Sequence, residues 1–176
     1  MANVFFTIGH STRTLHEFLT LLLGSRIDTL VDVRRIPRSR TNPQFNLETL
    51  PGALAPSVAY VHIAELGGRR GLRKVVPRSA NGYWRSRSFH NYADYAMGNE
   101  FAVGFARLLE LGRHGRCAIM CAATLWWQCH RRIIADYLIT RGETVLHVID
   151  VDDISMATLT PGARLQADGT LVYPEK

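Results

Sequence analysis

The chain has 176 residues, 47% of them hydrophobic, and a formal net charge of +6. This length is typical of one domain, and we expect a single α/β domain over residues 1–176, with a C-terminal hairpin and tail over 154–176. No apolar run approaches the ~20 residues of a membrane span, no signal-peptide pattern is found, and three cysteines do not suggest a disulfide framework. We therefore expect a cytoplasmic protein with no membrane partner.

Short apolar runs alternate with amphipathic stretches along the chain. Strands are predicted over residues 4–8, 29–33, 58–63, 117–121 and 144–149, and helices over residues 15–23, 47–54, 89–97, 100–111 and 129–140. Thr14 and Glu17 form a capping box for the first helix, Asn99 is expected to cap the fourth, and Asp168-Gly169 is a hairpin turn. This alternation predicts a mostly parallel sheet with helices on both faces.

Positive charge is concentrated in one part of the sequence. Residues 33–93 contain eleven basic and two acidic residues, a net charge of +9, while the rest of the chain is net acidic. Nineteen of the basic residues are arginine, which binds phosphate or carboxylate with two parallel hydrogen bonds. A GC-rich coding bias accounts for much of the arginine content but not for its distribution, which favours an anionic partner such as nucleic acid or a nucleotide.

Three segments are expected to meet at the carboxyl ends of the parallel strands, where such sheets bind ligands. They are residues 9–11, residues 32–35 and the segment from Cys121 onward. His10 is a candidate general base or phosphate ligand, and Asp32 could orient another group. The alternatives are a polar turn at His10 and a simple pairing of Asp32 with Arg34. The candidate anion-binding residues here are Ser11, Arg13, Arg34, Arg35, Arg38, Ser39, Arg40 and Asn42.

The cysteines admit several interpretations. Cys117 and Cys121 lie about 13 Å apart on one face of a strand, too far for a disulfide or shared metal. Cys121, at the strand end, is the better candidate nucleophile, and Cys129 with His130 starts a helix whose N-terminus lowers thiol pKa values. We expect no cofactor, although a metal bound by Cys121, Cys129 and His130 remains an alternative, as does simple packing of both thiols.

Aromatic residues accompany the basic segment. Trp84 and Trp127 are flanked by polar residues and are candidates for stacking on a base, although core packing is the stronger interpretation for most aromatic side chains here. Further candidates for binding substrate or phosphate are Arg69, Arg70 and Arg131.

Several motifs resemble the bacterial domain-of-unknown-function family 488. They span nearly the whole chain and are Thr7-Ile-Gly-His-Ser11, Val31-Asp-Val-Arg-Arg35, Pro37-Arg-Ser39, Asn42-Pro-Gln-Phe45, Tyr60-Val-His62, Glu65-Leu-Gly-Gly68, Met120-Cys-Ala122 and Cys129-His-Arg131. The resemblance implies a glutamate after Cys-Ala, where this chain has Ala123. A glutamate there would be a natural general base, so Ala123 belongs to the candidate catalytic set and its presence could disable catalysis.

Three functions follow as expectations. The first is a protein that binds nucleic acid or a nucleotide and hydrolyses an N-glycosidic or phosphoester bond, with His10, Asp32, Cys121, Cys129 and His130 at the reaction centre. The second is a thiol enzyme that uses Cys121 on a small anionic substrate, which a looser likeness to rhodanese-like sulfurtransferases also suggests. The third is a binding module without catalysis.

Overall fold

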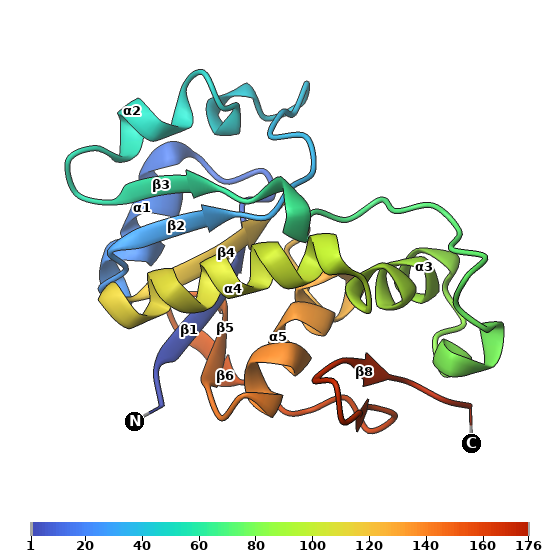
Figure 1. Ribbon diagram of the computed structural model, residues 1–176. Coiled ribbons are helices and arrows are strands. Elements are labelled where there is room, and N and C mark those ends of the chain that lie inside the picture. Colours follow the sequence, from blue (N-terminus) through green and yellow to red (C-terminus); the bar gives the residue numbers. More distant parts are fainter. Residues whose placement is uncertain (1, 176) are drawn as a thin grey trace.

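The computed structural model describes residues 2–175 and has one central sheet with helices on both faces (Figure 1). The six strands lie in the order β3-β2-β4-β1-β5-β6. β1 (Val4–Gly9), β2 (Thr29–Asp32), β3 (Ala59–His62), β4 (Cys117–Cys121) and β5 (Thr144–Asp150) are parallel, and β6 (Asp153–Met156) pairs antiparallel with β5. The α/β fold with a mostly parallel sheet is therefore confirmed.

Each face of the sheet has its own core. α1 (Leu15–Gly24) and α2 (Leu50–Leu54) pack around Phe6, Ile8 and Leu30. α3 (Arg87–Ala96), α4 (Asn99–His114) and α5 (Arg131–Thr140) cover the other face, around Phe5 and Ile119. Figure 1 shows α4 across the near face and α1 behind the sheet. Successive strand residues point to opposite faces, so fully apolar strands serve both cores.

The predicted elements hold with specific exceptions. The capping box of Thr14 and Glu17 is present, and the C-terminal hairpin joins β7 (Arg164–Leu165) to β8 (Leu171–Val172). The prediction that Asn99 is the N-cap residue of α4 was wrong, because Gly98 occupies that position without a side-chain hydrogen bond. The helix predicted over residues 47–54 is limited to the five residues of α2. β6 was not predicted, because this short edge strand is exposed on both sides.

The parallel register brings the carboxyl ends of the strands to one edge. Gly9 of β1 lies opposite Cys121 of β4, and Asp32 of β2 lies opposite Met120. α5 begins two residues later than predicted, because Cys129 is extended and His130 is the N-cap residue. None of the helices in residues 2–175 combines the length and apolarity that crossing a membrane requires.

Candidate functional site

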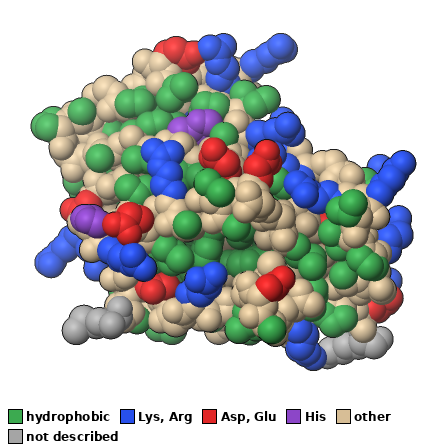
Figure 2. Space-filling view, in the orientation of Figure 1, with side chains coloured by type: hydrophobic (Ala, Val, Ile, Leu, Met, Phe, Trp, Pro, Cys, Tyr) green, Lys and Arg blue, Asp and Glu red, His purple; other side chains and the backbone are tan. Residues whose placement is uncertain are grey.

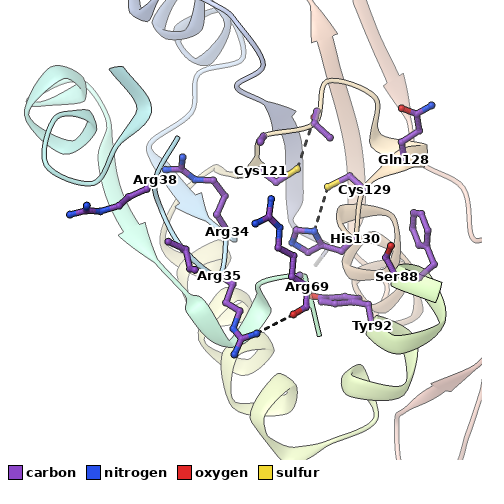
Figure 3. A pocket seen from close by; sticks show the side chains of 15 residues that line it. Arg34, Arg35, Arg38, Arg69, Ser88, Tyr92, Cys121, Gln128, Cys129 and His130 are labelled. Carbon is purple, nitrogen blue, oxygen red and sulfur yellow. Dashed lines mark hydrogen bonds between the residues drawn. The ribbon is translucent and has the colours of Figure 1, made fainter. Parts of the chain in front are cut away.

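A cleft of about 520 Å³ opens at the carboxyl ends of β2 and β4, close to the N-terminus of α5 (Figure 3). Guanidinium groups form one side of it, and two thiols, an imidazole and aromatic rings form the other. Its lining residues are Arg34, Arg35, Ile36, Arg38, Gly68, Arg69, Ser88, Phe89, Tyr92, Cys121, Ala122, Ala123, Gln128, Cys129 and His130. All three segments expected from the sequence meet at this edge, because the backbone N–H groups of His10 and Ser11 donate to the carbonyl oxygens of Cys121 and Ala122 at 2.9 and 3.0 Å. Only the second and third segments line the cleft itself.

Two glycines permit the backbone contacts that shape the cleft. A Cβ atom on Gly9 would lie 1.8 Å from the carbonyl oxygen of Ala123, so β1 can approach the 121–124 loop only without a side chain there. A Cβ atom on Gly67 would likewise lie 2.5 Å from the Cα of Arg35. This second contact places Arg69 beside Arg35, whose Nη1 donates to the Arg69 carbonyl at 3.0 Å.

Asp32 and Arg34 form a buried ion pair in the wall of the cleft. The Asp32 carboxylate accepts from the Arg34 backbone N–H at 3.0 Å, from its Nε at 2.9 Å and from its Nη2 at 2.7 Å. The Tyr60 hydroxyl also donates to it, and burial followed by this hydrogen bond raises the pKa of Tyr60. Asp32 is fully buried, so it holds Arg34 in place and does not face a substrate.

His10 lies behind this pair and does not line the cleft. Its Nδ1 donates to the Ser11 carbonyl at 2.9 Å, and its ring stacks on Phe45 with a centroid separation of 4.5 Å. Burial lowers the pKa of His10, because a charged imidazole would lose its hydration there. The structure thus places this candidate base in a packing position next to Arg34.

Cys129 has an unusually polar set of neighbours for a buried thiol. Its Sγ accepts from the backbone N–H of Arg131 at 3.5 Å and from the Arg131 Nε at 3.4 Å. The rest of the Arg131 guanidinium donates to Thr7 Oγ1 at 3.3 Å and to the carbonyl oxygens of Ala123 and Thr124 at 2.5 and 3.5 Å. Arg131 is only 1% exposed, and none of these acceptors in residues 2–175 is a carboxylate.

The orientation of His130 is fixed by the backbone. Its Nε2 donates to the Val33 carbonyl at 2.9 Å, so in the neutral ring the lone pair is on Nδ1. That Nδ1 lies 3.6 Å from Cys129 Sγ. His130 can therefore accept the proton of the Cys129 thiol or, once protonated, donate to its thiolate.

The pKa values of the two thiols in the cleft are shifted in opposite directions. Burial raises the pKa of the Cys121 thiol, and the neighbouring Cys129 raises it further. For Cys129 burial acts in the same direction, but the neighbouring Cys121, His130 and Arg131 outweigh it and hold its pKa well below the usual range. The geometry thus favours Cys129 as the thiolate, whereas the sequence had favoured Cys121.

Several arginines at the mouth of the cleft have no acidic partner. Arg35 and Arg69 are exposed and form no ion pair within residues 2–175, whereas Arg38 pairs with Glu48. Figure 2 shows basic side chains along the upper and right-hand edges of the molecule, over residues 34–46 and 66–88 of Figure 1. The mouth of the cleft therefore carries uncompensated positive charge.

Other predicted binding residues have structural contacts instead. Arg13 donates to the carbonyl oxygens of Gly9 and Ile149, and Arg70 to those of Gly67 and Ala64. Trp84 was predicted to be available for stacking, but it is 7% exposed and already stacked on Phe89.

The remaining predicted residues lie outside the cleft lining. Ser39 Oγ accepts from the Asn42 backbone N–H at 3.0 Å, which closes the turn there. Ser11 is half-buried, Arg40 is exposed, and Trp127 is 42% exposed and stays available to a ligand.

Sequence reasoning missed one wall of the cleft. Phe89 and Tyr92 of α3 supply apolar surface there, and Ile36 and the polar Ser88 and Gln128 also line the cleft. Residues 65–88, which are rich in glycine and arginine, fold back over the sheet and bring α3 here, and no local motif predicts that path. Within residues 2–175, no three His, Cys, Asp or Glu side chains are grouped so that they could hold a metal ion.

The model of a protein family described as "Domain of unknown function DUF488" matches residues 14–138, a range that contains every residue lining the cleft. No curated protein and no solved structure matches the chain.

Proposed function

The chain belongs to the DUF488 family, and from the geometry of its cleft we propose that it is a thiol-dependent enzyme. In this proposal the Cys129 thiolate attacks a small anionic substrate and accepts a group from it. The observation that carries the proposal is the pair of hydrogen bonds from Arg131 to Cys129 Sγ. A buried guanidinium without a carboxylate needs an anion, and a thiolate at this helix N-terminus supplies it.

His130 and the arginines have separate roles in this proposal. His130 Nδ1 takes the thiol proton, and the Val33 carbonyl keeps the ring in the orientation that this transfer requires. Arg35 and Arg69 attract the anionic substrate at the mouth, whereas Arg34, whose charge Asp32 balances, lines the cleft. Cys121 is the protonated neighbour and not the thiol that attacks the substrate.

Alkylation tests this proposal directly. Iodoacetamide should modify Cys129 rapidly even below about pH 7, where an ordinary thiol is only a few per cent ionised. Cys129→Ser should abolish this acid-range reaction. Cys117→Ser is the matched control, since burial raises the pKa of Cys117 to about 11 and its removal should change nothing. A wild-type rate that follows an ordinary thiol titration would remove the proposal.

A nucleic acid or nucleotide as the anionic ligand is a second candidate. It is supported by the exposed Arg35, Arg40 and Arg69, none of which forms an ion pair within the described part of the chain. Fluorescence anisotropy with labelled oligonucleotides should then show binding that weakens steeply with salt. The hydrolytic form of this candidate predicts that Ala123→Glu, which adds a carboxylate to the cleft lining, creates cleavage activity. Unchanged anisotropy at low salt would exclude the nucleic-acid candidate.

A further inference from the structure

We propose that Cys121 is the resolving thiol of Cys129, and that the substrate class is an anion carrying a transferable sulfane sulfur. The inference rests on the proposed role of Cys129 and adds the chemistry of the transferred group. In this sequence of steps Cys129 takes the sulfur as a persulfide, and Cys121 then displaces it as sulfide. The product is a Cys121–Cys129 disulfide that an external dithiol must reduce.

The placement of the two thiols carries the inference. Cys121 ends β4 and Cys129 precedes α5, and Figure 3 draws their sulfur atoms facing one another. Both side chains line the cleft although they are only 4% and 6% exposed, and each thiol is close enough to shift the pKa of the other. Cys117, on the same strand, does not line the cleft. The fold therefore places one particular second thiol beside the thiolate.

A second thiol is useful for only some substrates. A phosphoryl group on a cysteine is removed by attack of water at phosphorus, and a neighbouring thiol contributes nothing to that step. A persulfide, in contrast, is opened by attack of a thiol on sulfur, the step common to all thiol–disulfide exchange. A buried thiol facing Cys129 therefore favours sulfur as the transferred atom.

The steps balance for thiosulfate as the donor. The Cys129 thiolate attacks the outer sulfur of thiosulfate, forming a Cys129–S–S⁻ persulfide as the bond to the sulfite sulfur breaks and sulfite leaves. The Cys121 sulfur then bonds to Cys129 Sγ while the bond to the outer sulfur breaks. The outer sulfur leaves with the Cys121 proton as HS⁻. The two cysteine thiols are oxidised to a disulfide and the sulfane sulfur is reduced to sulfide.

The experiment incubates the full, reduced chain with inorganic thiosulfate in the absence of oxygen. Wild-type protein should release one sulfide per chain, lose two free thiols and give a Cys121–Cys129 linked peptide on digestion. Cys121→Ser should release no sulfide and should gain the mass of one sulfur atom on Cys129. Cys117→Ser should behave as wild type. The linked peptide from wild type tests the proposal even if Cys121→Ser fails to fold.

The outcomes separate this inference from the function on which it rests. A stable persulfide on wild-type Cys129, or sulfide release unchanged in Cys121→Ser, overturns the resolving role and leaves the thiolate function intact. If Cys129 is alkylated below about pH 7 but takes up no sulfur, the proposed sulfur substrate is wrong and the thiolate function stands. Failure of both alkylation and sulfur uptake removes the proposed function together with this inference.

Discussion

Arg131 donates two hydrogen bonds to the sulfur of Cys129, one from its backbone N–H at 3.5 Å and one from its side-chain Nε at 3.4 Å. The same residue therefore contributes the end of the helix dipole and a full positive charge to one thiol. Both contributions favour the thiolate, and both come from the first residue of α5. The position of this thiol in the sequence, two residues before Arg131, is the basis of the reactivity that we propose for it.

Replacing Arg131 should raise the pKa of Cys129. We expect Arg131→Met to move the pH profile of iodoacetamide alkylation upward by roughly 1 to 3 pH units, since a neighbouring cation lowers the pKa of an anion-forming group by about that much. Arg132→Met is the matched control, because the Arg132 side chain donates to Thr160 and lies over Trp84. The same pH profile in wild type and Arg131→Met would contradict the role given to Arg131.

The arginines at the mouth of the cleft should increase the rate of alkylation only for an anionic reagent. Iodoacetate carries a negative charge and iodoacetamide does not, so Arg35→Gln with Arg69→Gln should slow alkylation of Cys129 by iodoacetate and leave the iodoacetamide rate unchanged. Added salt should reduce the iodoacetate rate of wild type in the same way. Arg107→Gln, on the exposed side of α4, removes a positive charge away from the cleft and should leave both rates unchanged. A loss of both rates in the double variant would indicate a change of structure instead.

Asp32 should stabilise the fold through its buried pair with Arg34. Asp32→Asn leaves the Arg34 guanidinium buried without its counter-ion, and breaking a buried pair in this way costs roughly 3–5 kcal/mol. Glu48→Gln breaks the exposed pair with Arg38 and should cost less than about 1 kcal/mol. Urea denaturation of the two variants measures the difference. Similar midpoints for both would show that the buried pair stabilises the fold no more than the exposed one.

His147 should make stability depend on pH. Burial, with a smaller effect of Arg131, lowers its pKa from 6.5 to about 4. The unfolded chain therefore binds this proton first, and stability should fall as the pH drops from about 6.5 toward 4, by on the order of 3 kcal/mol. His147→Asn should flatten this dependence, whereas the exposed His16→Asn should not. A pH profile unaffected by His147→Asn would contradict this assignment.

The features that could be predicted from the sequence are those that depend on local residue patterns. The capping box at Thr14 and the apolar strands follow from residue spacing, and the parallel sheet follows from their alternation with helices. The choice between Cys121 and Cys129 depends on which thiol Arg131 and His130 face, and that is set by the extended backbone of Cys129. Burial of Trp84 depends on α3 folding back over the sheet, which its neighbours in the chain do not encode.

In the proposed thiolate state, Cys129 is the counter-ion of Arg131, and its charge links the chemical state of the site to the folding equilibrium. A substituent that removes the charge on Cys129 leaves a buried guanidinium uncompensated, whereas an anionic adduct keeps the balance. Melting temperature should therefore respond to what is attached to this one sulfur atom. A thermal-shift screen of small oxyanions and sulfur compounds could then search for the natural substrate without any assay of turnover.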